Sequence, residues 1–357
     1  MLPFIILIFL PIVIQHVHID GIDYEKKNKF VLVLFFIILT ILVALRHESV
    51  GNDTRNYIYY FEKIAQIPWS EITDVELELG YVILNKIVSV VTLDSQFFFA
   101  VVAVVCVGCM LPTYLRLCED SALTLVLFVT MSTFFMMFSG LRQMLAISVG
   151  FIAYEFVRKK KPVKFVITVV VAMLFHTSAI ILLVLYPLYY VRITKKWLFV
   201  VLPLMAGVFV FNSFIFSFLL SLLERFTRFE GIITQTQAYT ILILFVIFVV
   251  FCFVIPDEEK LDEECIGLRN ILLLSTTLQM FAPLHTLAMR MNYYFIIFIP
   301  MLIPKIIKNR SSQWNQIGMI ARHVMVVFFA IYFFTLANQG SASLKVLPYH
   351  FFWEDGI

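Results

Sequence analysis

The sequence predicts an all-α, polytopic integral membrane protein with about ten to twelve transmembrane helices, including a re-entrant helical hairpin. Of its 357 residues, 61% are hydrophobic and only 14% are charged, and the mean hydropathy is +0.94. A soluble domain carries about 45–50% apolar and about 25% charged residues, so this chain lacks the charge for a soluble surface. Its net charge of only +3 does not indicate a basic surface for binding nucleic acid, so nucleic acid is not expected as a partner.

Apolar runs follow one another along the chain. Each is expected to be a helix, because only a helix satisfies its own backbone groups in hydrocarbon without closing a barrel. No tandem repeat or low-complexity linker divides residues 1–357, so a single polytopic membrane domain is expected. The run 79–93 is short and holds Lys86, which predicts a partial or tilted element. The runs lie at about 2–17, 30–45, 79–93, 96–117, 122–138, 141–157, 165–191, 197–219, 238–255, 268–288, 291–308 and 317–337.

Basic residues predict the orientation, because cytoplasmic loops are enriched in lysine and arginine. The strongest basic block, residues 158–164, is therefore placed in the cytoplasm. The run 165–191 lies between two basic blocks, so it is expected to be a re-entrant hairpin that turns near residues 175–178. The loop 46–78 and the amphipathic segment 218–237 then face outward.

Several arginines fall on the outer side of this map, against the positive-inside rule. Arginine grips phosphate with two parallel hydrogen bonds and stays charged when partly dehydrated. The outer face is therefore expected to bind an anion. These arginines are Arg46, Arg55, Arg142, Arg225, Arg228 and Arg290.

The first candidate cluster directly follows an apolar run. Arg46, Asp53, Arg55 and Tyr57 surround Gly51-Asn52-Asp53, a turn signal. The alternative is an ordinary interfacial loop in which the tyrosines form an aromatic belt.

The second cluster is Ser139-Gly140-Leu141-Arg142-Gln143. As one helix, residues 122–157 would be about 54 Å long, so two helices are expected with Ser139-Gly140 at the turn. Arg142 would then lie in a first helical turn, which is the unfavourable end of the helix dipole for a cation. A structural salt bridge is the alternative, although no acid lies close in sequence.

Two further candidates are single residues. His176 lies at the expected hairpin turn, where neutral imidazole suits a general base; the alternative is a hydrogen-bonded packing residue. Arg290 lies between two apolar runs and precedes Tyr293; the alternative is an interfacial arginine. The acidic stretch 257–264 is expected to be a solvated loop. No metal and no cofactor is expected, because P-loop, G-x-G-x-x-G and H-E-x-x-H motifs are all missing from the sequence.

Taken in order, these motifs resemble the EpsG family of Wzy-type polysaccharide polymerases of bacterial envelopes. The resemblance covers nearly the whole chain. It rests on Arg46…Gly51-x-Asp53…Tyr57, Ser139-Gly140-Leu141-Arg142-Gln143, Phe175-His176-x-Ser178-Ala179, Arg290 with Tyr293-Tyr294-Phe295, and Pro348-Tyr349-x-Phe351-Phe352-Trp353.

The resemblance implies a glycosyltransferase of the bacterial plasma membrane, with its active site on the periplasmic or extracellular face. The sequence has no D-x-D pair, so the enzyme is expected to be metal-independent and to stabilise its leaving group with arginines. The substrate would be an oligosaccharide repeat unit linked through diphosphate to a polyprenyl lipid. The growing chain would pass from its lipid diphosphate to the incoming unit, for capsule, O-antigen or exopolysaccharide. The implied partners are the bilayer and, in the same pathway, a chain-length regulator and a flippase.

Residue roles follow from that reaction. Arg142 and Arg290 are expected to hold the diphosphate with Arg46 assisting. Either His176 or Asp53 would take the acceptor proton, and His176 is favoured, because a carboxylate beside two arginines should have a lowered pKa and be a weaker base. The residues expected to contact the substrate or acceptor are Arg55, Tyr57, Gln143 and Tyr293.

Three other functions remain open. A glycan ligase would use the same lipid donor and similar arginines. A flippase or transporter would more often show inverted repeats and broken spans, and the sequence has no internal symmetry of that kind. A structural partner of a synthase complex would not need several separate outer arginines.

Overall fold

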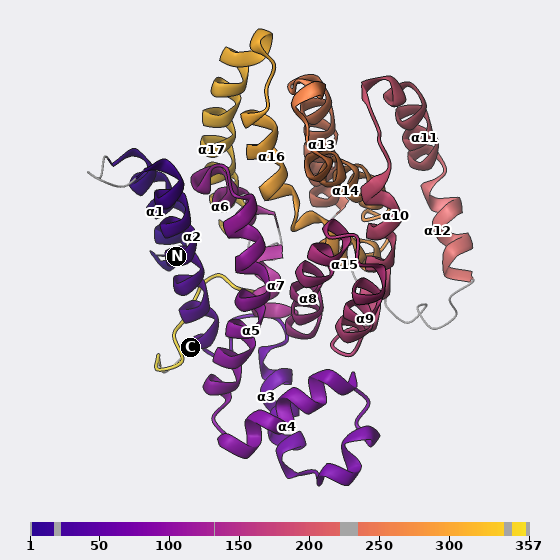
Figure 1. The fold of residues 1–357 in the computed structure, drawn as a ribbon. Helices are drawn as coiled ribbons and strands as arrows, with labels where there is room; N and C mark the ends of the chain where they lie inside the picture. Colours follow the sequence, from indigo (N-terminus) through magenta and orange to yellow (C-terminus); the bar gives the residue numbers. More distant parts are fainter. Residues whose placement is uncertain (1, 18–22, 132, 222–234, 339–344, 355–357) are drawn as a thin grey trace. The chain divides into compact units, whose positions relative to one another are not determined.

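The computed structural model is built from α-helices joined by short loops and 3₁₀ segments (Figure 1). It describes residues 2–17, 23–131, 133–221, 235–338 and 345–354. Within these ranges no β-sheet forms, and the extended pairings are isolated bridges such as the one between Arg46 and Phe351. The all-α prediction is therefore confirmed.

The chain divides into two compact units: unit 1 comprises Met1–Leu183 and Val324–Ile357, and unit 2 comprises Val184–His323. The elements of unit 1 are α1 (Leu2–His16), α2 (Tyr24–Ala44), α3 (Thr54–Gln66), η1 (Trp69–Asp74), α4 (Leu79–Val91), α5 (Ser95–Leu117), α6 (Ser121–Thr130), α7 (Thr133–Ser139), α8 (Leu141–Arg158), α9 (Pro162–Met173) and η2 (Thr177–Val184). Those of unit 2 are α10 (Leu185–Tyr190), η3 (Lys195–Trp197), α11 (Leu198–Val210), α12 (Asn212–Ser221), α13 (Gln235–Val254), η5 (Glu258–Lys260), α14 (Glu263–Gln279), α15 (Thr286–Ile296), α16 (Ile299–Lys308) and η6 (Ser312–Trp314). The helix α17 (Asn315–Asn338) begins in unit 2 and ends in unit 1.

Fewer helices than expected are long enough to cross a bilayer. In the described ranges three qualify by length and composition: Tyr24–Ala44, Ser95–Leu117 and Ser312–Thr335. The number rises to six if each of three bent helix pairs is one span, so the count of ten to twelve is not confirmed. One such pair, α15 and α16, bends by 45° at a break after which Pro300 is the second residue of α16, because proline lacks the N–H that would continue the preceding helix.

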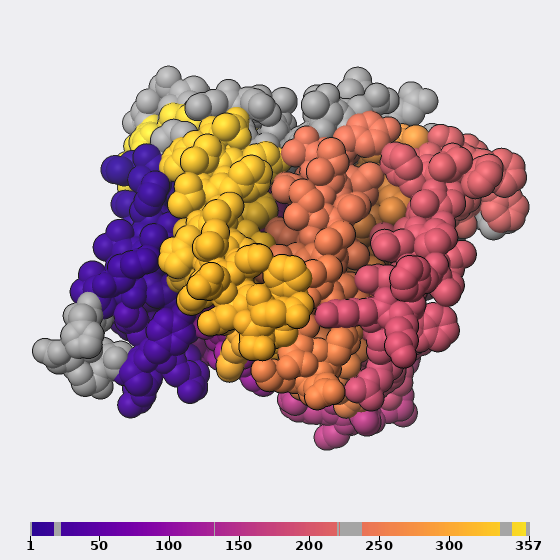
Figure 2. Space-filling model, turned by 90° about the horizontal axis from the view of Figure 1, so that it is seen from above, coloured from indigo at the N-terminus to yellow at the C-terminus, as the bar shows by residue number. Residues whose placement is uncertain are grey.

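Aromatic rings form the core of unit 1 and tie its two chain ends together. The ring of Phe4 in α1 lies 5.6 Å from that of Phe134 and 5.6 Å from that of Tyr349, measured between centroids. Phe333 of α17 lies 6.2 Å from Phe4 and stacks on Phe135. Figure 2 accordingly shows the indigo α1 beside the yellow α17.

Lys86, the charged residue of the apolar run 79–93, anchors the short helix α4 to α3. Its 13 residues extend about 20 Å, less than a hydrocarbon core of about 30 Å. The Lys86 ammonium donates to the carbonyl oxygens of Ile64, Ala65 and Ile67 at 3.3, 2.9 and 2.6 Å. These carbonyls belong to the C-terminal end of α3, where unpaired carbonyl groups and the helix dipole favour a cation.

The segment expected to form a hairpin reverses near its predicted turn. The helix α9 packs along α8 and ends at Met173, and η2 begins at Thr177. Leu182 of η2 then packs on Gly150 in the middle of α8, where a Cβ atom would lie 3.2 Å from the Leu182 Cδ1. Within unit 1, both limbs of the turn therefore lie against the same helix.

The acidic stretch 257–264 is not simply a solvated loop, which corrects the sequence interpretation. Arg269 is fully buried in α14, and its Nη1 pairs with Glu258 Oε1 at 2.6 Å. Lys305 of α16 pairs with Asp262 at 2.9 Å. The stretch thus supplies counter-ions for two buried cations, which burial would otherwise penalise heavily.

The expected outer segment 218–237 can be compared only at its edges. Residues 222–234, which include Arg225 and Arg228, lie outside the described part of the chain. Before them, α12 ends at Ser221, and after them α13 begins at Gln235.

Candidate functional site

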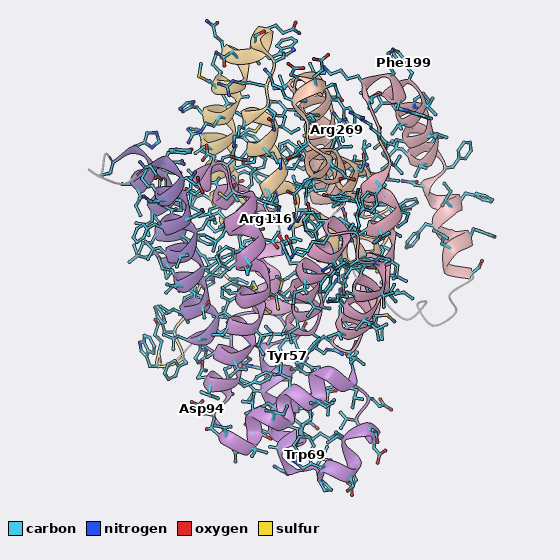
Figure 3. The ribbon with its side chains drawn as sticks, in the orientation of Figure 1. Tyr57, Trp69, Asp94, Arg116, Phe199 and Arg269 are labelled. Atoms are coloured by element: carbon cyan, nitrogen blue, oxygen red, sulfur yellow. The ribbon has the colours of Figure 1, made fainter. Side chains whose placement is uncertain are left out.

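Three sequence segments that are far apart in the chain come together in unit 1. They are the loop before α3, the break between α7 and α8, and the turn after α9. The Asn52 backbone N–H donates to Ser139 Oγ at 3.1 Å, and the Gly80 N–H donates to the Leu174 carbonyl at 2.8 Å. In Figure 3, Tyr57 lies toward the end of α5 where Asp94 is labelled, whereas Arg116 lies toward the other end.

Gly51 allows the first loop to dock on the second segment. Its φ of +94° is rarely adopted by residues with a Cβ atom, and a Cβ atom there would lie 2.5 Å from the Phe138 carbonyl oxygen. The hydroxyl of Thr54 donates to the Val50 carbonyl and closes the turn. The Gly51-Asn52-Asp53 turn signal in the sequence therefore corresponds to a tight approach to the end of α7.

Tyr57 connects α3 to the start of α8. Its buried hydroxyl accepts a hydrogen bond of 3.0 Å from the Leu141 N–H, one of the N–H groups that the start of a helix leaves unpaired. Burial, and then the nearby Asp53 carboxylate, raise the pKa of Tyr57 to about 12, so the hydroxyl stays neutral at physiological pH. Tyr57 therefore fixes the first turn of α8, which carries Arg142.

Arg142 forms an ion pair with an acid that the sequence analysis did not single out. Its Nη1 lies 2.5 Å from Oε2 of Glu78, the residue before α4. The Arg142 side chain is 32% exposed and the Glu78 side chain 14% exposed, so the pair lies at the surface of unit 1. Arg142 does lie in the first turn of α8, as the sequence predicts, and Glu78 compensates for that dipole end.

Arg46 lies deeper than the other candidate cations. It is fully buried, its Cζ lies 4.0 Å from the Phe99 ring centroid, and its Nη1 donates to the Val43 carbonyl. Its Nε and Nη2 have no hydrogen-bond partner among the described residues. Burial lowers the pKa of Arg46 to about 10, with Tyr57 opposing that shift, so the guanidinium stays charged at neutral pH.

The C-terminal segment covers Arg46. Its residue Phe351 forms the bridge to Arg46, and the His350 carbonyl accepts from the His47 N–H at 2.9 Å. Tyr349 donates its hydroxyl hydrogen to the Leu42 carbonyl at 2.7 Å. This segment therefore closes one side of the candidate site.

The turn that holds His176 lies beside the start of α4. The Leu174 carbonyl accepts from both Gly80 and Tyr81 N–H groups, at 2.8 and 3.3 Å. His176 Nδ1 lies 2.7 Å from Ser178 Oγ and 3.3 Å from the Ser178 N–H. Because a backbone N–H can only donate, Nδ1 accepts, which places the proton of the neutral ring on Nε2.

The remaining candidates of unit 1 differ in exposure. Asp53 is half-buried next to Tyr57, directly before α3. Gln143 is buried in α8. Arg55 is exposed and pairs with Glu48 at 3.2 Å, a surface contact of small energetic value.

Arg290 and Tyr293 lie in unit 2, within α15 and not at a turn between two spans. The turn occupies residues 280–285 instead, and His285 caps α15 by accepting from the Leu287 N–H at 3.0 Å. Arg290 is exposed, whereas Tyr293 is buried one helical turn further along. Asn292, also buried, hydrogen-bonds to Ser275 and Gln279 of α14 and fixes the rotation of α15.

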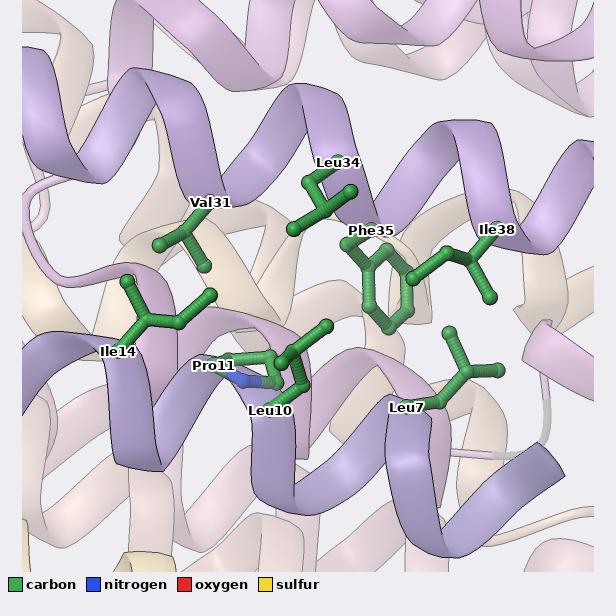
Figure 4. Close-up of a pocket in the computed structure, with 8 residues that line it drawn as sticks. All are labelled: Leu7, Leu10, Pro11, Ile14, Val31, Leu34, Phe35 and Ile38. Atoms are coloured by element: carbon green, nitrogen blue, oxygen red, sulfur yellow. The ribbon is translucent and has the colours of Figure 1, made fainter. Parts of the chain in front are cut away.

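An apolar crevice between α1 and α2 does not suit a sugar or a diphosphate. Figure 4 shows only hydrocarbon side chains around it. They are Leu7, Leu10, Pro11, Ile14, Val31, Leu34, Phe35 and Ile38. The polar groups around Arg142, at the N-terminal end of α8, suit an anion better than this crevice does.

Comparison with known proteins gives one match. The model of the EpsG family matches residues 29–351, a range that holds every candidate site residue. No curated protein and no solved structure matches the chain.

Proposed function

The chain belongs to the EpsG family of Wzy-type polymerases, and from this premise we propose that it polymerises lipid-linked oligosaccharide repeat units at the outer face of the bacterial plasma membrane. Family membership and the apolar helices identify a membrane protein with a general role in polysaccharide polymerisation. The lipid carrier, the membrane face and the residue roles are our proposal.

The proposed reaction transfers a growing glycan from a polyprenyl diphosphate to a hydroxyl of an incoming unit. The bond between the anomeric carbon and the diphosphate oxygen breaks, and a glycosidic bond to the acceptor oxygen forms. The acceptor proton passes to a base, and the polyprenyl diphosphate leaves with its extra negative charge. Preorganised cations stabilise such a leaving group most where water is scarce.

The observation that carries this proposal is the convergence on Arg142. The Tyr57 hydroxyl holds the first turn of α8, the Ser139 hydroxyl holds the loop before α3, and the Leu174 carbonyl holds the start of α4. These contacts hold the segments around the first turn of α8, and the Arg142 side chain that this turn carries is one-third exposed, which suits repeated binding of an anion.

The opposite end of α8 supports the outer location. Arg142 is the second residue of this helix and Arg158, the first residue of the basic block 158–164, is its last, so the two lie about 24 Å apart along the axis. Arg116 and Arg158 both bind Glu155 at that second end, at 2.5 and 3.0 Å. If the basic block lies in the cytoplasm, as the positive-inside rule expects, Arg142 lies at the outer face.

We assign Arg142 to the diphosphate and Arg46 to the electrostatic field around it, while the assignment of Arg290, which belongs to unit 2, stays a prediction from the sequence. His176 takes the acceptor proton, with Asp53 as the second candidate; proton uptake at Nδ1 would replace its contact with the Ser178 N–H. Arg55, Tyr57, Gln143 and Tyr293 remain assigned to the substrate or acceptor, Tyr57 in part through its hold on α8. A flippase and a chain-length regulator of the same pathway are the proposed partners.

Deletion of the gene tests the reaction class through what accumulates. A polymerase predicts single repeat units on their lipid at the outer leaflet. The same species confined to the inner leaflet would indicate a flippase, and finished polymer retained on its lipid would indicate a ligase. Either of those two results would overturn the proposal.

A further inference from the structure

We propose that Glu78 is an internal anion that occupies Arg142 in the resting enzyme, and that the donor diphosphate displaces it. This inference rests on the proposed function, because it requires Arg142 to bind a diphosphate. It adds a residue that regulates access to the diphosphate site.

The position of Glu78 is unusual for an acid before a helix. A residue at this position commonly accepts a hydrogen bond from its own helix, but Glu78 makes no such cap. Its carboxylate instead reaches Arg142, 64 positions along the chain, with 2.5 Å between Oε2 and Nη1. The Glu78 carboxylate therefore pairs with a residue of α8 and does not cap its own helix, α4.

The backbone around Glu78 is held firmly, so an exchange would need only a side-chain rotation. The Gly80 N–H donates to the Leu174 carbonyl at 2.8 Å. A Cβ atom at Gly80 would lie 2.8 Å from that same oxygen, so the two segments touch backbone to backbone. Glu78 can release Arg142 without any movement of this junction.

The electrostatics favour replacement by a more highly charged anion. Arg142 and the N-terminal ends of α4 and α8 together present positive charge to a single carboxylate. A diphosphate carries more charge and can bind a guanidinium through two oxygens at once. Because the Arg142 side chain is 32% exposed, an anion can approach it from the surface.

Binding of a diphosphate probe to the full-length protein in nanodiscs tests this exchange. The probes are farnesyl diphosphate and inorganic pyrophosphate, with the dissociation constant measured by calorimetry at fixed ionic strength. Glu78→Gln keeps the side-chain shape and removes the competing charge, so Kd should fall about tenfold. Glu78→Ala should give the same gain, which guards against a folding defect in one variant.

Glu76→Gln is the matched control, because Glu76 is exposed and lies two residues away with the same charge. It should change Kd by less than about twofold, since salt screens exposed charges. When Arg142→Gln is already present, adding Glu78→Gln should not lower the Kd for the diphosphate probe.

The outcomes separate this inference from the proposed function. Equal Kd values for Glu78→Gln and Glu76→Gln would overturn the role of Glu78. If Arg142→Gln nonetheless weakens binding, the role of Arg142 stands. Equal binding by Arg142→Gln and the unaltered protein would overturn both.

Discussion

Gly51 approaches Phe138 so closely that a Cβ atom on the glycine would lie 2.5 Å from the Phe138 carbonyl oxygen. These residues come from segments that the sequence analysis identified separately, the loop before α3 and the break before α8. This contact therefore brings the Gly51-Asn52-Asp53 turn against the end of α7, so that the two sequence motifs form parts of one site.

Gly51→Ala should destabilise the protein by about 2–4 kcal/mol, through the positive φ and the overlap with a backbone oxygen. The thermal unfolding midpoint in detergent measures the effect. Gly108→Ala is the control: Gly108 lies inside α5, a Cβ atom there meets nothing within 4 Å, and alanine should be neutral or stabilising. Equal midpoints for the two variants would contradict the close approach.

Tyr57→Phe should cost about 1–3 kcal/mol, because the buried Leu141 N–H loses its acceptor. Polymer synthesis should fall as well, since the first turn of α8 loses a constraint. Tyr59→Phe serves as the control, because Tyr59 is exposed. A Tyr57→Phe variant with unchanged stability and activity would show that the hydroxyl does not position Arg142.

Arg46→Met should not lower the unfolding midpoint, although it removes a fully buried side chain. Two of the three guanidinium nitrogens lack partners among the described residues, and each buried unpaired group costs about 1–3 kcal/mol. The cation–π contact with Phe99 offsets part of that cost. Loss of polymer with retained stability is the expected pair of results. A sharp drop in the midpoint would instead make Arg46 a structural residue.

The pair of Arg269 and Glu258 should behave in a strongly non-additive way. Glu258→Gln leaves a fully buried guanidinium without its counter-ion and should cost about 3–5 kcal/mol. Combining it with Arg269→Met should cost less than Glu258→Gln alone, as measured by thermal unfolding. Lys260→Met breaks an exposed pair with Asp257 and should cost at most about 1 kcal/mol. Additive losses would contradict the buried pair.

Local signals predicted the parts of the site that depend on local structure. The glycine turn at Gly51, the break at Ser139-Gly140 and the reversal near His176 all occur where the sequence indicates them. Each is a backbone feature set by a few neighbouring residues, so periodicity and turn residues were sufficient.

Long-range pairing could not be predicted in the same way. A salt bridge of Arg142 was the alternative in the sequence analysis, but no acid lies close to it in the sequence. Its partner Glu78 is 64 positions away and becomes a neighbour through folding. The sequence predicted a turn at Arg290, but this residue lies within α15. The actual turn, at residues 280–285, contains Phe281, Ala282 and Leu284, so it cannot be distinguished from the surrounding hydrophobic run. Pro283 and the capping His285 were the signals that could have located it.

Polymerisation by the purified full-length protein tests the role of Arg142 most directly. The substrate is the lipid-linked single repeat, isolated from the deletion strain, and the products are the glycan ladder and the released polyprenyl diphosphate. The unaltered protein should produce both, and Arg142→Gln should produce neither while keeping its unfolding midpoint. A normal ladder from Arg142→Gln would contradict the assignment of this arginine to the diphosphate.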